Sequence, residues 1–499
     1  MTSLPETLIL VCYFFVLSIL AIYGWHRYYL IHLYMKNRDK VPNPNTPVPS
    51  RDQMPPVTIQ LPIYNEMYVA DRLIDAVCEM DYPRELMEIQ VLDDSTDETR
   101  EIAELAVRRH SARGFDIKYL HRVDRTGYKA GALEAGLRTA KADYIAIFDA
   151  DFIPPKDFLL KTLPHFDEPR VGMVQARWGH INEDYSLLTK VQAILLDAHF
   201  VLEHGSRNRA GCFFNFNGTA GIWRREAIDS AGGWQHDTLT EDLDLSYRAQ
   251  LRGWQFRFLP HVVSPAEVPV EMNSFKSQQH RWAKGSIQTC MKLLPMILRS
   301  KQPLKVKVEA FFHLTANFNY LLMCLLSILM FPAMWVRYNM GWTEMLLIDV
   351  PLFIAATASF FRFYMLAQRE LHTDWRTRLK YLPFLMSVGI GLSVNNTKAV
   401  LEALFKKQSE FARTPKYGIE RDSDDWSGKK YHQTIGLQTL IELALGLYFT
   451  GTVFYALINQ IYGTVPFLML FQVGFLYTSL LSILQQFTGD EEMAPEIAK

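Results

Sequence analysis

The chain has 499 residues, 49% of them hydrophobic, and a formal net charge of −1 at pH 7. This length accommodates about two or three domains, and a hydrophobic share that includes 31 Phe is high for a protein that contacts water alone. The balanced charge excludes a general electrostatic affinity for nucleic acid, so any anionic ligand must be held by local side chains. The five cysteines form no C-x-x-C pair and therefore indicate neither a disulfide framework nor a zinc site.

Long uncharged runs predict membrane-spanning helices. The run 7–25 contains 19 residues without a formal charge, close to the roughly 20 residues that a helix needs to cross a bilayer. It lacks a small-residue cleavage pattern, which indicates a retained anchor. Further crossings are expected at 310–336 and 345–367, and residues 443–488 are long enough for two helices that turn around 459–464.

The positions of Lys and Arg predict the orientation of these crossings. If the amino terminus lies outside, the outer segments contain a single such residue, Arg337, and the remaining basic segments face the cytosol. Residues 28–309 then form a cytosolic domain. The 14 apolar residues 381–394 are too few to cross and predict an interfacial or re-entrant helix. We therefore expect a multi-pass integral membrane protein of a plasma or inner membrane.

The cytosolic part shows the alternation typical of an α/β domain. Residues 42–56, rich in proline and asparagine, predict a linker, after which short β-branched runs alternate with helical stretches. Strands are expected at 57–61, 88–92, 116–120 and 144–148, and helices near 67–79, 97–110 and 129–139. Parallel strands in such folds present ligand-binding residues just past their carboxyl ends. In this sequence those residues are Tyr64, Asn65, Glu66, Asp93, Asp94, Asp149 and Asp151.

Asp149 and Asp151 form an Asp-x-Asp motif where the chain leaves an apolar strand. Both carboxylates can approach one divalent cation there, and such hard oxygen ligands suit Mg²⁺ or Mn²⁺, which also takes phosphate oxygens from a substrate. Taken alone, two acids after a strand are more often part of a solvated loop or a helix cap. The metal interpretation therefore depends on the other motifs of the chain.

Two further motifs can serve a nucleotide. Asp93 and Asp94 can hydrogen-bond a base and a ribose, although the stretch 93–97 is equally a good turn and helix cap. Lys129, between Gly127 and Gly131, can meet a diphosphate, and the alternative is an ordinary lysine at a helix start. The sequence has no Gly-x-Gly-x-x-Gly or Walker motif, so neither a dinucleotide nor an ATP loop is indicated.

Two motifs later in the cytosolic part can serve an acceptor. Glu241 and Asp242 precede an amphipathic helix at 243–251, where a carboxylate can act as a general base or favour the positive end of the helix. Downstream, Arg281 can neutralise a leaving diphosphate and Trp282 can stack on a sugar. The alternative for these two side chains is that they anchor an amphipathic stretch at the membrane surface.

The order of these motifs resembles that of the family 2 processive glycosyltransferases, which include cellulose, hyaluronan and chitin synthases. The matching motifs are Asp93-Asp94, Asp149-x-Asp151, Thr240-Glu241-Asp242 and Gln278-x-x-Arg281-Trp282. Longer stretches, at 91–97, 127–133 and 216–221, are most similar to the plant cellulose-synthase-like mannan and glucan synthases. The resemblance covers residues 55–290 well and the membrane part loosely.

The resemblance implies a role for each motif. Nucleotide binding is implied for Tyr64, Glu66, Asp93, Asp94, Lys129 and Asp149. It implies that Asp149 and Asp151 hold the metal, Mg²⁺ or Mn²⁺, together with the diphosphate. Asp242 is the implied general base, with Glu241 beside it in the catalytic motif. Gln278, Arg281 and Trp282 are implied to frame the acceptor entrance.

A possible gating loop follows the interfacial segment. Residues 411–416 resemble the loop that closes over the donor, whose usual form is Phe-x-Val-Thr-x-Lys. Phe411, Thr414 and Lys416 match this pattern, whereas Arg413 replaces the valine. The alternative is an ordinary basic cytosolic loop.

The expected fold is an α/β cytosolic glycosyltransferase domain of the GT-A type, with a Rossmann-like mixed sheet, plus an α-helical transmembrane bundle. The expected divisions are a transmembrane anchor (1–27), a linker (28–56), the GT-A domain (57–270), interfacial helices (271–309), two transmembrane helices (310–367), an interfacial helix with the gating loop (368–434), two transmembrane helices (435–488) and a cytosolic tail (489–499).

The expected function is that of an inverting membrane glycosyltransferase with its catalytic domain in the cytosol. It transfers hexose from UDP-glucose or GDP-mannose to a growing β-linked polysaccharide, with coupled export. The closest alternative is a non-processive transferase that glycosylates a lipid such as a ceramide or diacylglycerol. An alternative of another class is a transporter or receptor with a nucleotide-sensing domain. The expected partners are a nucleotide sugar donor, a glycan acceptor and the lipid bilayer, and no nucleic acid.

Overall fold

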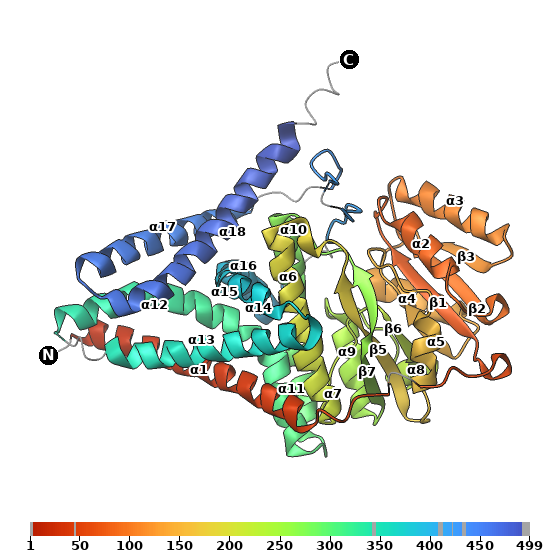
Figure 1. The fold of residues 1–499 in the computed structure, drawn as a ribbon, viewed down its shortest axis with the longest axis horizontal. Helices are drawn as coiled ribbons and strands as arrows, with labels where there is room; N and C mark the ends of the chain where they lie inside the picture. The colour runs from red at the N-terminus through yellow and green to blue at the C-terminus, as the bar shows by residue number, and fades with distance from the viewer. Residues whose placement is uncertain are drawn as a thin grey trace.

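The structure, a computed structural model, describes residues 3–43, 46–341, 346–407, 413–421, 423–431 and 436–491. These residues form an α/β domain around one sheet and an elongated bundle of helices. The helix α10 (Met272–Arg299) lies between the two parts (Figure 1). The amino-terminal end of the described chain lies at the end of the bundle that is farthest from the α/β domain.

A seven-stranded mixed sheet forms the centre of the α/β domain. Its strands are β1 (Val57–Ile63), β2 (Met87–Asp93), β3 (Asp116–His121), β4 (Tyr144–Ile147), β5 (Val171–His180), β6 (Gly221–Arg224) and β7 (Gln255–Ala266). The spatial order is β3-β2-β1-β4-β6-β5-β7. The first four strands are parallel to one another, and β6 runs antiparallel to its neighbours β4 and β5. The four predicted strands are confirmed with small differences at their ends, and β5 to β7 were not predicted.

Apolar side chains cover both faces of this sheet. On one face, Val57 and Ile59 of β1 belong to a core that includes α2 (Ala70–Cys78) and α3 (Thr99–Ser111). On the opposite face, Ile145 of β4 belongs to a core that includes α4 (Tyr128–Thr139), α8 (Arg225–Ser230) and α9 (Glu241–Leu251). The remaining helices of the domain are α5 (Phe158–Thr162), α6 (Leu187–Ala198), a π-helix (His199–His204) and α7 (Gly205–Arg209). Because both faces are covered, a ligand reaches the sheet at its strand ends.

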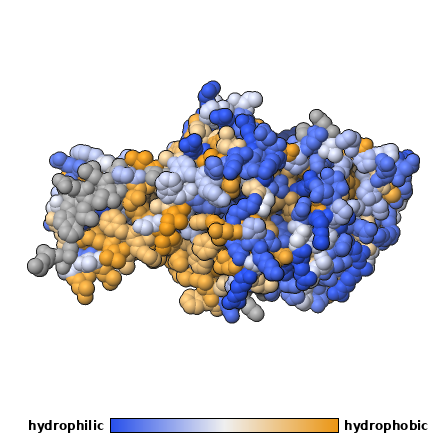
Figure 2. Space-filling model, turned by 90° about the horizontal axis from the view of Figure 1, so that it is seen from below, coloured by the Kyte–Doolittle hydropathy of each residue, from blue (hydrophilic) through white to orange (hydrophobic). Residues whose placement is uncertain are grey.

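The helical bundle contains candidate membrane spans. Its helices are α1 (Leu4–Lys36), α11 (Leu304–Thr315), α12 (Phe318–Asn339), α13 (Leu346–Leu371), α14 (Trp375–Arg378), α15 (Leu382–Gly391), α16 (Ser393–Leu404), α17 (Leu437–Ile458) and α18 (Val465–Glu491). Among the described residues, four helical stretches are long and apolar enough to cross a membrane, namely α1, α12, α17 and 462–487. Hydrophobic surface gathers over the bundle and hydrophilic surface over the α/β domain (Figure 2). These features support membrane association.

Several boundaries differ from those predicted. The run 310–336 is not one helix, because α11 ends at Thr315 and α12 begins at Phe318. Its hydrophobicity continues across the break, so the sequence pattern did not locate it. Residues 28–36 of the predicted linker continue α1. The crossing predicted at 345–367 corresponds to α13, which packs along α1 and is not among the four candidate spans of the described residues. Residue 345 lies outside the described residues, as do 492–499 of the predicted tail.

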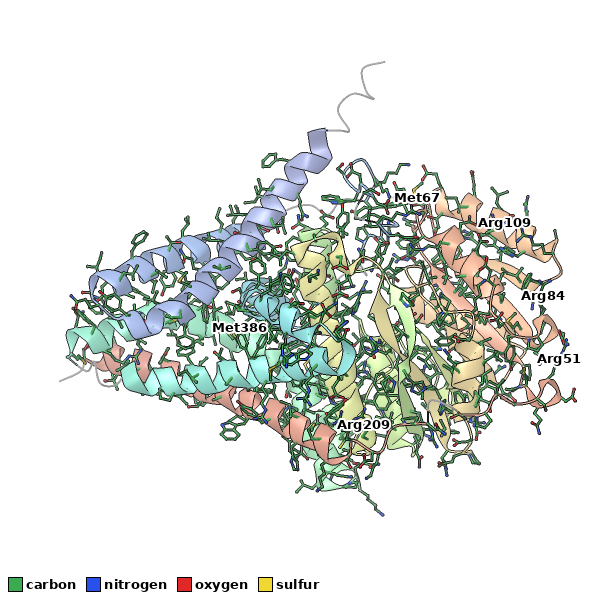
Figure 3. The ribbon with its side chains drawn as sticks, viewed as in Figure 1. Arg51, Met67, Arg84, Arg109, Arg209 and Met386 are labelled. Carbon is green, nitrogen blue, oxygen red and sulfur yellow. The ribbon has the colours of Figure 1, made fainter. Side chains whose placement is uncertain are left out.

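Polar contacts join the α/β domain to the bundle. Lys276 of α10 donates hydrogen bonds to the carboxylate of Glu442 in α17 and, at 2.8 Å, to Ser482 Oγ in α18. On the other side of the junction, the Arg209 guanidinium lies 4.3 Å from the centre of the Tyr34 ring in α1 (Figure 3). Removing one partner of a buried ion pair costs about 3–5 kcal/mol. Loss of either Lys276 or Glu442 is therefore expected to weaken the packing of α10 against the bundle.

The close approach of α15 and α18 depends on glycine. A Cβ at Gly391 would lie 2.5 Å from the Gly474 carbonyl oxygen, whereas a Cβ at Gly389 on the same helix would meet no described atom within 4 Å. We expect Gly391→Ala to lower the free energy of unfolding by about 1–3 kcal/mol through overpacking. We expect Gly389→Ala to leave it unchanged or raise it, since alanine favours the helix. Thermal unfolding of both variants in detergent checks this, and equal melting temperatures would contradict it.

Candidate active site

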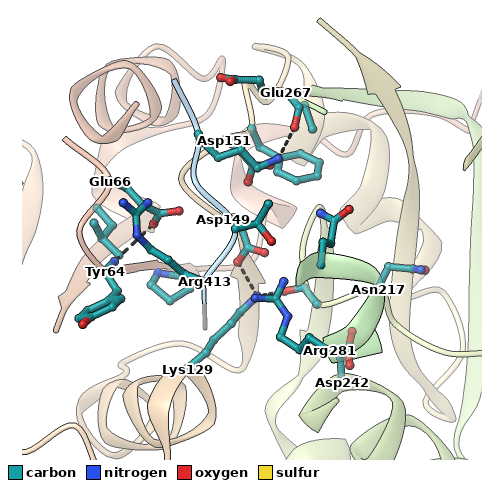
Figure 4. A pocket seen from close by; sticks show the side chains of 18 of the residues that line it. Tyr64, Glu66, Lys129, Asp149, Asp151, Asn217, Asp242, Glu267, Arg281 and Arg413 are labelled. Atoms are coloured by element: carbon teal, nitrogen blue, oxygen red, sulfur yellow. Dashed lines mark hydrogen bonds and ion pairs between the residues drawn. The ribbon is translucent and has the colours of Figure 1, made fainter. Parts of the chain in front are cut away.

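Residues from all the predicted motifs meet in one pocket at the carboxyl ends of β1, β2 and β4 (Figure 4). The predicted residues that line it are Tyr64, Glu66, Asp94, Lys129, Asp149, Asp151, Glu241, Asp242, Gln278, Arg281, Trp282, Thr414 and Lys416. Asp93 does not line it, and Phe411 lies outside the described residues. The fold thus brings together side chains that are separated by up to about 350 residues in the sequence.

The two aspartates of the Asp-x-Asp motif each face a lysine. Asp149 Oδ1 accepts a hydrogen bond from Lys129 Nζ, and Asp151 Oδ2 lies 2.7 Å from Lys416 Nζ. Burial opposes the charge on Lys129, but the combined attraction to Asp149, Glu241 and Asp242 outweighs it and the pKa of this lysine is raised. Burial also raises the pKa of Asp149, because the carboxylate loses water. Both aspartates are therefore held in place by cations that come from different segments of the chain.

Acids outnumber bases in this pocket. The lining carboxylates are Glu66, Asp94, Asp149, Asp151, Glu241, Asp242 and Glu267, and the lining cations are Arg125, Lys129, Arg281, Arg413 and Lys416. Burial raises the pKa of Glu66 to about 7, because nearby cations do not fully compensate for the lost hydration. An additional cation would relieve this excess of negative charge.

Asp149 and Asp151 are the acids that best fit such a cation. The described residues contain no cluster of three or more His, Cys, Asp or Glu side chains placed to hold a metal. Mg²⁺ is usually bound by only one or two carboxylates plus phosphate oxygens of a substrate. A pair of carboxylates in an acid-rich pocket is therefore a suitable donor set for Mg²⁺ or Mn²⁺.

Asp93 and Asp94 have different surroundings. Asp93 is fully buried, and its carboxylate accepts hydrogen bonds from Ser95 N at 3.0 Å and from Tyr119 Oη at 2.6 Å. Asp94 lines the pocket, and Arg122 donates to both of its carboxylate oxygens, at 2.8 and 2.5 Å. A bidentate pair of this kind fixes the carboxylate in one orientation. Both acids shape the end of β2, and their contact with a nucleotide stays a prediction.

Tyr64 and Glu66 follow the carboxyl end of β1 and line the pocket. The Arg125 guanidinium carbon stands 3.3 Å from the centre of the Tyr64 ring, and Tyr64 N donates to Glu66 Oε2 at 3.3 Å. A guanidinium stacked on an aromatic ring gives a flat surface against which a base can stack. This end of the pocket therefore suits the nucleoside part of a nucleotide.

Asp242 lies in the first turn of α9. Leu243 N donates to its Oδ1 at 2.8 Å. A Cβ at Gly218, which has a φ of +81°, would lie 3.2 Å from Asp242 Oδ2 and 3.3 Å from Lys129 Nζ. Burial, followed by repulsion from Glu241, raises the pKa of Asp242 to about 7. A carboxylate with this pKa can exchange a proton near neutral pH, and the missing side chain at position 218 keeps its outer oxygen accessible.

Gln278, Arg281 and Trp282 share one face of α10, because they occupy positions i, i+3 and i+4 of the helix. All three line the pocket. The helix also approaches the start of α9 closely, since a Cβ at Gly285 would lie 2.6 Å from Thr240 Cγ2. The Thr-Glu-Asp and Gln-x-x-Arg-Trp motifs are therefore neighbours in space.

Residues 413–418 close one side of the pocket and are anchored to Glu267. Lys416 Nζ donates to the Glu267 carbonyl oxygen, and the Glu267 carboxylate accepts hydrogen bonds from Tyr417 N and Gly418 N, each at 2.9 Å. The backbone that carries Lys416 is thus fixed beside the Asp-x-Asp motif. Movement of these residues as a gating loop stays a prediction.

Some lining residues were not predicted. They are Arg125, Trp178, His180, Asn217 and Glu267. Trp178 and His180 belong to β5, and Glu267 follows β7, and neither strand shows a clear period-2 alternation in the sequence. Asn217 lies in the stretch 216–221, which was noted for its resemblance without a role for this side chain. A signal for Asn217 was therefore present, whereas β5 and β7, which position Trp178, His180 and Glu267, were missed. Arg125 lies in the loop between the predicted strand β3 and the predicted helix α4 and belongs to no motif.

Two glycines with positive φ give a matched test of the space around Asp242. Gly218→Ala would place its Cβ against Asp242 and Lys129, whereas Gly211→Ala, at a φ of +64°, would meet only Lys305 Nζ at 4.0 Å. Both variants carry backbone strain of about 1–2 kcal/mol, so we expect similar losses of stability. We expect a roughly 100-fold loss of catalytic turnover for Gly218→Ala alone, because small displacements of reacting groups are costly. Equal turnover in the two variants would contradict this geometry.

Comparison with known proteins agrees with the fold. The family profile described as Glycosyl transferase family 21 matches residues 15–382. The chain is 42% identical over 282 residues, 56% of its length, to probable glucomannan 4-beta-mannosyltransferase 4 of Oryza sativa subsp. japonica. It is 43% identical over 253 residues, 50% of its length, to glucomannan 4-beta-mannosyltransferase 2 of Arabidopsis thaliana. The matches cover 51% and 47% of those proteins, so the chain spans about half the length of these relatives.

A solved structure has a similar fold. It is the mannosyltransferase PcManGT from Pyrobaculum calidifontis in complex with GDP-Man and Mn2+, with a TM-score of 0.52 and 19% sequence identity, over 79% of this chain and 99% of that one. This similarity confirms the predicted α/β glycosyltransferase domain, and the plant relatives confirm the resemblance to cellulose-synthase-like mannan synthases. The chain belongs to glycosyl transferase family 21 and is a glycosyltransferase.

Proposed function

We propose that this glycosyltransferase transfers mannose from GDP-mannose, with UDP-glucose as the second candidate donor, to a growing β-linked polysaccharide at the cytosolic face of a membrane. The observation that carries the proposal is the convergence of Asp149, Asp151, Asp242 and Arg281 on one pocket. A direct displacement at an anomeric carbon needs three parts. They are a pair of carboxylates that binds one divalent cation, a general base, and a positive side chain for the leaving group.

The choice of donor rests on the relatives. The plant proteins are named as glucomannan 4-beta-mannosyltransferases, and the mannosyltransferase of similar fold from Pyrobaculum calidifontis is in complex with GDP-Man. These names favour mannose and a guanine nucleotide. The flat surface of Tyr64 and Arg125 allows the base of either nucleotide to stack. Stacking therefore does not distinguish GDP-mannose from UDP-glucose, and transfer from each labelled donor is measured.

Asp149 and Asp151 are the proposed ligands of the divalent cation, Mg²⁺ or Mn²⁺. When bound, the cation supplies positive charge that stabilises the departing diphosphate. Lys129 and Lys416 pair with these aspartates and would add positive charge beside the diphosphate. The excess of acids in the pocket supports a bound divalent cation, because the diphosphate would add further negative charge that the cation offsets.

The proposed chemistry is a single displacement with inversion. Asp242 accepts the proton of the acceptor hydroxyl. At the same time the hydroxyl oxygen of the acceptor bonds to the anomeric carbon, and the bond from that carbon to the diphosphate oxygen breaks. Lys129 and Arg281 neutralise the charge that gathers on the departing nucleoside diphosphate. No covalent bond between sugar and protein forms. Trp282 offers an aromatic face on which the acceptor sugar stacks.

A polymer acceptor with coupled export is supported by the position of α10. This helix carries Trp282 and packs against α16 and α18 of the bundle (Figure 1). A glycan that leaves the pocket past Trp282 therefore meets the membrane helices. The alternative acceptor is a lipid such as a ceramide or diacylglycerol, which would also reach a pocket beside the bundle, and product size distinguishes the two.

Purified full-length protein in detergent, supplied with labelled donors, tests the proposal. We expect transfer from GDP-mannose that stops when EDTA removes the cation and resumes with Mg²⁺ or Mn²⁺. We expect Asp242→Asn to reduce transfer by about 10²–10⁴-fold with donor binding retained. A ladder of many sugars on a gel supports the polymer, whereas a lipid carrying one sugar contradicts it. If the protein uses neither GDP-mannose nor UDP-glucose, the donor assignment is wrong.

The raised pKa of Asp242 predicts a pH dependence. The base must be ionised to accept a proton, and its pKa lies at about 7. We therefore expect kcat/KM to fall about tenfold for each pH unit below 7 and to level off above it. Initial rates between pH 5.5 and 8.5, with donor binding measured at each pH, check this. A profile that stays flat down to pH 5.5 would exclude Asp242 as the base.

A further inference from the structure

Arg413 introduces a cation where the gating loops that this segment resembles carry a valine. Its side chain lines the pocket and is drawn beside Glu66 and near Asp149 (Figure 4). The adjacent residues Thr414 and Lys416 match the loop pattern. A positive charge is therefore added to the pocket without loss of the neighbouring groups.

The guanidinium of Arg413 has donors that no described residue uses. Its nitrogens Nη1 and Nη2 are buried and have no hydrogen-bond partner among the described residues. The guanidinium carbon lies 4.0 Å from the centre of the Tyr431 ring, which supports the flat group on one side. Burying a charged donor without a partner is costly. Such a group is stabilised when an anion reaches it.

The pocket's two lysines are already committed to protein oxygens. Lys129 donates to Asp149 and to the Gly218 carbonyl oxygen. Lys416 pairs with Asp151 and donates to the Glu267 carbonyl oxygen. Arg413 differs from both, because its terminal nitrogens keep their hydrogen-bonding capacity.

The segment after Arg413 is held in place by contacts with the α/β domain. Tyr431, on which the guanidinium rests, donates a hydrogen bond to Asp97. Glu420 of the same segment accepts a hydrogen bond from Arg72 at 2.8 Å. Together with the anchor at Glu267, these contacts fix the support of the guanidinium, so little conformational freedom is lost when it binds a ligand.

We propose that Arg413 is a ligand of the donor's diphosphate, a role that rests on the proposed function. The planar guanidinium forms two parallel hydrogen bonds with phosphate oxygens. The Asp-x-Asp pair that would hold the cation and diphosphate lies in the same pocket. Arg413 therefore binds the diphosphate from the segment after α16, whereas Asp149 follows the end of β4.

A purely structural alternative is that Arg413 only offsets the charge of Glu66. In that case Glu66→Gln removes the need for the cation, and the double variant Arg413→Val with Glu66→Gln binds nucleotide like Glu66→Gln alone. If Arg413 binds the diphosphate directly, the double variant binds nucleotide more weakly than Glu66→Gln alone. The pair of variants separates the two explanations even if each change alters stability.

The test measures equilibrium binding of GDP, UDP and the corresponding nucleosides to the full chain in detergent with Mg²⁺ or Mn²⁺. Arg413→Val restores the residue of the resembled loop, and Arg421→Val, an exposed position of the same segment, is the matched control. We expect Arg413→Val to raise the Kd of the diphosphate by roughly 10- to 100-fold with nucleoside binding unchanged. Arg413→Lys should recover part of the affinity, and Arg421→Val should match the wild type.

Three results would overturn the inference. They are unchanged diphosphate affinity in Arg413→Val, an equal loss for nucleoside and diphosphate, and rescue by Glu66→Gln. If Arg413→Val unfolds, the comparison of Arg413→Lys with wild type decides, because lysine keeps the charge and loses the bidentate geometry. A wild-type chain that binds no nucleoside diphosphate overturns the proposed function as well, which distinguishes that failure from a failure of Arg413 alone.

Discussion

An excess of acids over bases in one pocket is the constraint on which the site depends. Carboxylates that lose contact with water need cations or hydrogen-bond donors, and here the cations come from distant segments. Lys129 comes from α4, Arg281 from α10 and Lys416 from the segment after α16. The electrostatic requirement of the pocket therefore joins the sheet, the helix between the two parts and the segment after α16 into one site.

Helix α10 connects this chemistry to the membrane part. Gly285 lets the helix approach the start of α9, and Lys276, about two turns earlier, is bound to Glu442 of α17. One rigid helix thus contacts both the base candidate's motif and a membrane helix. This arrangement fixes the distance between the pocket and the bundle, as the proposed export of a growing polysaccharide would require.

Much of the fold and the site was predictable because the relevant signals are local. The strands β1 to β4 are β-branched or apolar runs, and each polar motif follows its strand or opens its helix within a few residues. The strand β6 has four residues and pairs with β4 and β5, which lie far away in the sequence. Four residues are too few for a recognisable hydrophobic pattern, so the sequence did not predict this strand. The break between α11 and α12 lies within a continuous apolar run, which hydrophobicity alone does not divide.

By itself the sequence determined the class of the domain, the apolar segments and the identity of most of the charged groups that meet in the pocket. The tertiary structure alone decided how those groups are paired. It buried Asp93 against Tyr119, placed Arg125 on the ring of Tyr64 and brought Lys416 to Asp151. The physical reason is that the strength of a contact between charged or polar groups depends on their distance and burial in three dimensions. The spacing of residues along the chain determines neither quantity.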